Sequence, residues 1–361
     1  MKYTRVRIES MGYELAPVVI TSDELEDRLG PVYRRLCMAP GQLEALTGIA
    51  ERRWWEEDHP LSSGAVAAAR HAFDRCNVTP EDVEVLIYTG VCREQFEPAT
   101  ACRVAAELGV PADCAIFDLS NACLGMLNGL VDVANRIELG QIRAGLVVSC
   151  ESSRDIVNTT IERLLENPTM DFFKSSLATM TGGSGAAAIL VTDGSFGEAT
   201  GRQLRGGVTR TAPQYHALCR WGMDALLPAV IPAAQIAQSM LPRAFGEFMS
   251  TDSVSVMKHG VELGLKTFHQ FLMRLGWSAH LLDRVICHQV GSMHRETVLN
   301  TLGIPAEKDF STFQHLGNMG TVSLPLTAAM AEERGHLQPG HKVGLFGIGS
   351  GLNTLFLGVE W

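Results

Sequence analysis

Short runs of valine, isoleucine and leucine alternate along the chain with longer segments whose apolar residues recur every three or four positions. The runs are short enough for buried strands, and the longer segments have the periodicity of amphipathic helices. Strands that alternate with helices are typical of α/β proteins with largely parallel sheets, so we predict that fold class. The predicted strands cover residues 83–88, 144–148, 186–191, 284–287 and 342–346, and the predicted helices 63–75, 124–137 and 254–275.

Two parts of the sequence repeat one pattern. The segment EDVEVLIYTGV at 81–91 resembles HLLDRVICHQV at 280–290. Each is followed by a helical stretch, by a strand-like start (116–118 and 310–312) and by a helix that begins near a glycine. A repeated order of elements indicates that the chain contains the same α/β unit twice.

We therefore predict two duplicated α/β halves, residues 1–195 and 196–361. Two segments, 151–180 and 196–255, have no counterpart in the other half and are interpreted as insertions. They are rich in methionine, phenylalanine and leucine, which suits an apolar binding wall and suits ordinary core packing about as well.

Composition limits the partners of the chain. Of its 361 residues, 30 are basic and 40 acidic, and the net charge of -10 with no cationic block argues against nucleic acid or an anionic membrane surface. No apolar run reaches the roughly 18 residues of a membrane helix, and no signal peptide is visible, so we expect no integral membrane span. The nine cysteines lack CxxC spacing, which favours reduced thiols in the cytoplasm and no metal or other cofactor.

Cys123 is the strongest candidate for a reactive group. It follows a strand-like run and stands at the predicted start of a helix, in FDLSNACLGMLNGL. Helix N-termini favour anions, so we expect this position to lower the pKa of the thiol and increase its thiolate fraction. A buried structural cysteine fits the local pattern equally well.

His288 and Asn318 stand where the duplicated halves present polar residues at the ends of strands. His288 follows a predicted strand in VICHQVGSMH, and Asn318 lies between glycines in FQHLGNMGTVSLPL. Taken alone, the first suits a structural histidine and the second a turn. Together with Cys123 they form a sensible set, because a thiol accepts acyl groups while His and Asn donate hydrogen bonds to a carbonyl or enolate oxygen.

The segment GIGSGLN at 347–353 does not fit a dinucleotide-binding loop, since Leu352 stands where a third glycine is needed. Its glycines favour a backbone that approaches a bound ligand closely and donates to an oxyanion.

These motifs carry a family resemblance. LTGIAERRW at 46–54, NACLGMLNG at 121–129, ICHQVGSMH at 286–294, HLGNMGTVSLP at 315–325 and GIGSGLN resemble the thiolase superfamily, and within it the β-ketoacyl-ACP synthase III-like condensing enzymes. REQFEPATA, GGVTR and LCR look most like the OleA-type β-ketoacid synthases, which join two fatty acyl-CoA molecules head to head.

The resemblance implies a thiolase-like fold with αβαβα layers, a homodimer, and a role for each site residue. Cys123 would be acylated, while His288 and Asn318 would stabilise the enolate of the second acyl-CoA. The backbone amides of Cys123 and Ser350 would form the oxyanion hole. Glu97 would enter the partner's active site as the base for the α-proton; on its own, it fits a solvated loop charge.

The resemblance also has a departure. Synthase III enzymes carry a tryptophan before the TGI motif that stacks on the CoA adenine, whereas here Trp54 and Trp55 follow the motif.

Our leading prediction is Claisen condensation of two acyl-CoAs to a β-keto acid, as in olefin biosynthesis. The alternatives are decarboxylative condensation with malonyl-ACP (acyl carrier protein), another acyltransfer through the same cysteine, and a non-catalytic acyl-binding protein.

Overall fold

The computed structural model describes residues 1–197, 202–225 and 245–361. Within these residues nine strands form one mixed sheet, in the order β11-β12-β13-β8-β1-β7-β6-β4-β5. Its strands are β1 (Arg7–Leu15), β4 (Val85–Thr89), β5 (Ala115–Leu119), β6 (Ala144–Glu151), β7 (Gly185–Thr192), β8 (Gln203–Thr211), β11 (Arg284–Cys287), β12 (Lys342–Gly349) and β13 (Asn353–Glu360).

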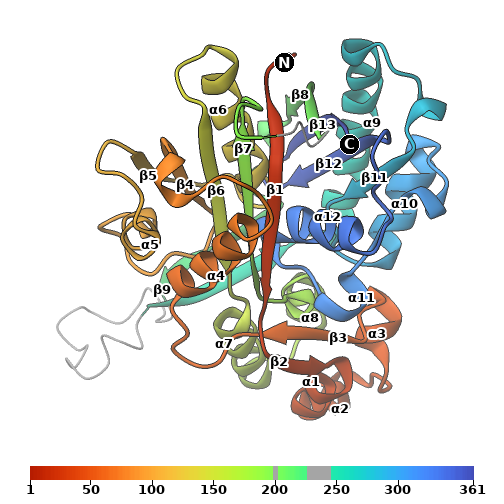
Figure 1. Ribbon diagram of the computed structural model, residues 1–361. Helices are drawn as coiled ribbons and strands as arrows, with labels where there is room; N and C mark the ends of the chain where they lie inside the picture. Colours follow the sequence, from red (N-terminus) through yellow and green to blue (C-terminus); the bar gives the residue numbers. More distant parts are fainter. Residues whose placement is uncertain (198–201, 226–244) are drawn as a thin grey trace.

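The main helices cover the faces of this sheet, and smaller elements lie at one end of it (Figure 1). The covering helices are α4 (Leu61–Phe73), α5 (Thr100–Leu108), α6 (Gly125–Glu138), α9 (Ser253–Leu275), α10 (Ser292–Leu302) and α12 (Ser323–Glu333). The smaller elements are α1 (Ser22–Arg28), α2 (Gly30–Leu36), α3 (Gln42–Thr47), α7 (Arg154–Glu166), α8 (Met170–Ser176), α11 (Phe313–Leu316), β2 (Val18–Thr21) and β3 (Glu51–Trp54), besides the hairpin of β9 (Cys219–Ala225) and β10 (Phe245–Thr251).

The strand pattern of the first half recurs in the second. In the first half, β4 and β6 are parallel, β6 and β7 antiparallel, and β7 and β1 antiparallel. In the second half, β11 and β12 are parallel, β12 and β13 antiparallel, and β13 and β8 antiparallel. The two patterns meet where β1 touches β8 through Arg7 and Gln203. The predicted duplication of an α/β unit is confirmed.

The buried side chains divide the molecule into five layers. Successive residues of a strand point to opposite faces, so Val85 of β4 joins the central core with α6 and α12, while Leu86 joins the outer core with α4 and α5. On β12, Leu345 faces the central core and Phe346 faces α9 and α10. The αβαβα arrangement follows, with α6 and α12 between the two halves of the sheet.

Two details differ from the sequence-based expectation. Residues 203–211, interpreted as part of an insertion, form β8, which pairs as β1 does in the first half. The strand-like start at 310–312 forms no strand. Among the described residues, this side of β11 has an isolated bridge between Val285 and Asp309 and no further strand pairing. The predicted division after residue 195 falls between β7 and β8 and stays a prediction.

The remaining insertions lie beside the sheet. Residues 151–180 contain α7 and α8, and the β9–β10 hairpin comes from 196–255, part of which (198–201 and 226–244) is outside the described residues. Among the helices that the structure describes, none is both long and apolar enough to cross a membrane.

Candidate active site

A cavity of about 750 Å³ lies between the two halves and the β9–β10 hairpin. Four of the five predicted site residues line it: Cys123, His288, Asn318 and Ser350. They come from the loop after β5, the end of β11, the turn before α12 and the turn after β12. The duplicated topology brings these loops to one place, as the sequence predicted.

Cys123 is presented by a sharp turn between β5 and α6. The residue before it, Ala122, has a φ of 45°, a left-handed conformation that costs a non-glycine residue about 1 kcal/mol or more. The N-cap of α6 is Leu124, directly after the cysteine. The strained turn therefore sets the thiol at the cavity, at the start of the helix.

The predicted direction of the thiol pKa is wrong. Burial, with smaller contributions from the nearby Cys219 and Glu151, raises the pKa of Cys123 to about 12. The helix N-terminus was expected to stabilise the thiolate. The thiol stands in a mostly apolar cavity, however, and the free energy needed to remove a thiolate from water there exceeds that stabilisation. Cys123 is therefore a protonated thiol at neutral pH, and its reaction requires a proton acceptor.

His288 is held in place at the end of β11, where its backbone N–H donates to the Phe346 carbonyl at 2.9 Å. Its side chain is 5% exposed, and within the described part of the chain its Nδ1 has no hydrogen-bond partner. Burial lowers the pKa of His288 to about 3, with His294 adding a smaller effect. A neutral imidazole can both accept a proton and donate a hydrogen bond.

His294, on α10, is a second cavity histidine that sequence reasoning missed. It lines the cavity, its Nδ1 also lacks a partner among the described residues, and burial lowers its pKa to about 4. The segment ICHQVGSMH contained it, but no spacing rule distinguished it from a surface histidine of the helix.

The two cavity histidines predict a pH-dependent stability. In the unfolded chain both titrate near 6.5, whereas the folded chain keeps them neutral down to the lowered pKa values of about 3 for His288 and 4 for His294. Below about pH 6.5 the unfolded chain binds more protons, so the free energy of unfolding falls as the pH falls from 6.5 toward 4. We expect a lower melting temperature at pH 5 than at pH 7.5, and a smaller difference in His294→Asn. An equal pH dependence in both proteins would contradict this.

Asn318 is fixed by its backbone and by its own side chain. Its N–H donates to the Thr181 carbonyl at 2.8 Å, and its carbonyl accepts from the Gly183 N–H at 2.9 Å. The side-chain Oδ1 accepts from the Gly320 N–H at 3.1 Å. Because Oδ1 is occupied in this way, the amide NH₂ is the group left to donate toward a ligand.

Gly349, directly before Ser350, lies against Cys123. A Cβ added at Gly349 would lie 3.6 Å from the Cys123 nitrogen and 3.2 Å from Cγ of Leu124, which shows how closely the two backbones approach. In the described residues, the N–H groups of Cys123 and Ser350 donate to no other residue. Two unpaired N–H groups next to a thiol can bind the oxyanion that forms when the thiol attacks a carbonyl.

The rest of the cavity has mainly apolar walls. The β9–β10 hairpin and the start of α9 supply most of these residues, so the predicted apolar wall lies where the insertion was expected. The wall contains Trp221, Met223, Phe248, Met249, Val256 and Met257.

Glu97 is not brought into the cavity of its own chain. It is exposed in the loop between β4 and α5, next to a cis bond to Pro98. The neighbouring Phe96 is 100% exposed. The carboxylate that does line the cavity is Glu151, at the end of β6, which is 3% exposed and was not singled out from the sequence. Burial raises the pKa of Glu151, although the N–H groups of Val91 and Cys92 oppose this.

Neither tryptophan after the TGI motif is available to stack on a ligand. Both are buried, and their Nε1–H groups donate to the carbonyls of Gly182 and Glu151, at 3.2 Å from Trp54 and 3.1 Å from Trp55. They belong to the core beside the cavity.

Known proteins share both the sequence and the fold. Residues 272–361 match the family model of the 3-oxoacyl-[acyl-carrier-protein (ACP)] synthase III C-terminal part. The acyl-CoA:acyl-CoA alkyltransferases of Shewanella oneidensis and Xanthomonas campestris are 54% and 34% identical to this chain, each match covering 100% of both proteins. The β-ketoacyl-[acyl-carrier-protein] synthase III 3 of Streptomyces coelicolor is 29% identical, over 98% of this chain and 96% of that protein.

The crystal structure of cerulenin-bound Xanthomonas campestris OleA has a TM-score of 0.90 with this chain, at 33% identity over 100% of this chain and 98% of that one. A cysteine-to-serine variant of the same protein, solved with bound lauric acid and lauroyl-CoA, has a TM-score of 0.89 at 33% identity, over 99% of this chain and 100% of that one.

The fold, the cysteine-centred cavity and these relationships define a condensing enzyme of the thiolase superfamily. Within that superfamily, the chain belongs to the family of the acyl-CoA:acyl-CoA alkyltransferases, the OleA-type enzymes.

Proposed function

We propose that this enzyme condenses two fatty acyl-CoA molecules in a Claisen reaction without decarboxylation and releases a β-keto acid. The main support for this proposal is the cavity, which is lined by Cys123, His288 and Asn318 together with an apolar wall. The names of the two alkyltransferases and the lauroyl-CoA bound to the OleA variant support acyl-CoA as the substrate. The product places the enzyme in lipid biosynthesis.

In the first half-reaction the thiol of Cys123 attacks the thioester carbonyl of one acyl-CoA. Because the pKa of the thiol is raised to about 12 and that of His288 is lowered to about 3, no free thiolate–imidazolium pair forms first. His288 instead takes up the thiol proton as the carbon–sulfur bond forms and passes it to the departing CoA sulfur. The N–H groups of Cys123 and Ser350 stabilise the oxyanion. The new carbon–sulfur bond forms, the bond to the CoA sulfur breaks, and the proton leaves with CoA.

In the second half-reaction Glu97 of the partner subunit removes the α-proton of a second acyl-CoA. His288 and Asn318 donate hydrogen bonds to its thioester oxygen, which carries the enolate charge. The α-carbon then attacks the acyl-Cys123 carbonyl, so a carbon–carbon bond forms and the bond to sulfur breaks, and the cysteine takes up a proton. Water hydrolyses the β-ketoacyl-CoA to CoA and the β-keto acid.

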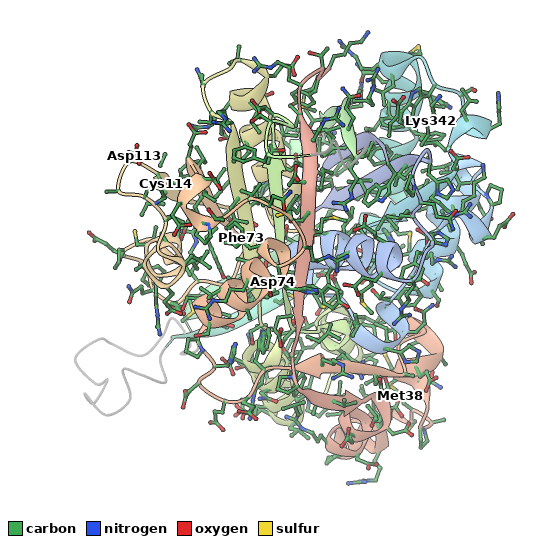
Figure 2. All side chains as sticks on the ribbon, viewed as in Figure 1. Met38, Phe73, Asp74, Asp113, Cys114 and Lys342 are labelled. Atoms are coloured by element: carbon green, nitrogen blue, oxygen red, sulfur yellow. The ribbon has the colours of Figure 1, made fainter. Side chains whose placement is uncertain are left out.

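The role of Glu97 requires a homodimer, which two surface features support. The outer edge of β5 pairs with no strand of the described chain, and Ile116 on that strand is 38% exposed. Figure 2 places Asp113 and Cys114, directly before β5, at the margin of the molecule. Unpaired strand edges and exposed aromatic residues such as Phe96 are typical of surfaces that a second copy covers.

The remaining assignments follow from this chemistry. CoA thioesters serve as substrates, and the mechanism gives no role to a metal or other cofactor. All nine cysteines are unpaired, which supports a reducing cytoplasm as the place of action.

Decarboxylative condensation with malonyl-ACP is the second candidate, favoured by the synthase III match over 272–361. Purified enzyme should therefore be given myristoyl-CoA alone and, separately, with malonyl-ACP, with the products identified by mass spectrometry. We expect the β-keto acid, or the ketone left after it loses CO₂, from myristoyl-CoA alone. Product formation only with malonyl-ACP would replace the proposal by the second candidate.

A further inference from the structure

Glu151 is a buried carboxylate without a cationic partner among the described residues. Its charge is met instead by backbone donors of the loop that follows β4. The Val91 N–H donates to Oε1 at 3.0 Å, and the Cys92 N–H donates to Oε2 at 3.1 Å. Both oxygens are therefore engaged, and the carboxylate holds the first residues of that loop.

The same carboxylate packs against the turn that carries Asn318. A Cβ added at Gly320 would lie 3.3 Å from Oε1 of Glu151, and one added at Gly90 would lie 2.8 Å from that atom. Both glycines have positive φ, 57° and 135°, and a side chain at either position would crowd the carboxylate. Oε1 thus lies between two loops that are far apart in the sequence.

Each of these loops holds a residue of the proposed mechanism. Gly320 donates to Oδ1 of Asn318 at 3.1 Å and so orients its amide. Val91 and Cys92 begin the loop that carries Glu97 before α5 starts at Thr100. Glu151 therefore contacts the turn that holds Asn318 in the cavity of its own chain, and it also contacts the start of the loop whose Glu97 would enter the cavity of the partner subunit.

We propose that Glu151 is a positioning residue, whose carboxylate sets the Asn318 turn against the start of the Glu97 loop. This inference rests on the proposed function, because the mechanism assigns Asn318 and Glu97 to the second half-reaction. The first half-reaction uses Cys123, His288 and the oxyanion N–H groups, none of which Glu151 holds by a hydrogen bond. Loss of the carboxylate thus affects condensation more than acylation.

The test variant is Glu151→Gln, which keeps the shape but turns an NH₂ group toward one of the two N–H donors. The matched control is Glu26→Gln. Glu26 is also buried at 6% exposure and also accepts two backbone N–H groups, from Gly41 and Leu43, but it lies outside the cavity. The control measures what the same chemical change costs when it only loosens a loop.

We expect Glu151→Gln to lower the kcat of condensation about 100-fold, the size of effect that a misplaced reacting group produces. Its KM for myristoyl-CoA should stay near wild type. The acylation of Cys123, followed by intact-protein mass spectrometry, should not fall, because removing the Glu151 charge takes away one cause of the raised pKa of the thiol. Hydrogen exchange should become faster in peptides covering 90–99 and 318–322. Glu26→Gln should leave all of these quantities near wild type.

Unchanged condensation or unchanged exchange in both peptides of Glu151→Gln would overturn the inference. So would a proportional loss of acylation and condensation, since that indicates a general structural role. A different result would contradict the proposed function: the wild-type enzyme would make no β-keto acid from myristoyl-CoA alone. The exchange measurement does not depend on activity and decides the positioning role in that case as well.

Discussion

Replacing Cys123 by alanine is expected to abolish both the acyl-enzyme and the β-keto acid, with a fall in turnover on the order of 10⁴-fold or more. The thiol supplies the covalent intermediate, and the methyl group of alanine cannot form one. After incubation with myristoyl-CoA, intact-protein mass spectrometry should show one added acyl group on the wild type and none on Cys123→Ala.

The matched control for this substitution is Cys114→Ala. Burial also raises the pKa of Cys114, to about 11, but this residue lies before β5 and outside the cavity. Its variant should acylate and condense like the wild type. An acyl adduct that persists on Cys123→Ala, or one that disappears from Cys114→Ala, would place the nucleophile elsewhere.

The second large effect is expected from Glu97→Gln, which should lower condensation about 10²- to 10⁴-fold, the usual contribution of a general base. The amide has a similar shape but cannot accept the α-proton. Acylation of Cys123 requires no α-proton transfer, so it should persist and the acyl-enzyme should accumulate. Glu107→Gln, an exposed carboxylate on α5 outside the cavity, serves as the control.

A mixed dimer tests whether Glu97 acts in the partner subunit. Chains carrying Glu97→Gln and chains carrying Cys123→Ala, with different affinity tags, give a heterodimer in which one cavity has Cys123 from one chain and Glu97 from the other. We expect about half of the wild-type activity per dimer, because one of two sites is complete. If Glu97 served the cavity of its own chain, neither site would be complete and the heterodimer would be inactive.

The sequence predicted the fold and the meeting of Cys123, His288 and Asn318 at one cavity for a physical reason. Buried strands and amphipathic helices have different periods, so β4, β6, β7, β11 and β12 and the helices between them were visible. Once the repeat was recognised, Cys123, His288 and Asn318 were expected at corresponding loop ends.

What the sequence did not predict depends on the surroundings of a residue. The pKa of Cys123 is raised because the cavity removes water from the thiol, and the apolar walls come from β9, β10 and α9, which are distant in sequence. Glu151 was missed because its partners, the loop after β4 and the Asn318 turn, come together only in the folded chain. A strand such as β8, with GGVTR at its centre, has too few large apolar residues to be recognised by pattern.

The central claim is that both carbonyl carbons of the product come from acyl-CoA. The enzyme should be incubated with [1-¹³C]myristoyl-CoA. The β-keto acid should be converted at once to its methyl ester, before it loses CO₂, and the mass of the ester should be measured by mass spectrometry. Head-to-head condensation predicts two ¹³C atoms in the intact acid, at the carboxyl and keto carbons. A product that forms only with unlabelled malonyl-ACP and carries one ¹³C atom would contradict the account.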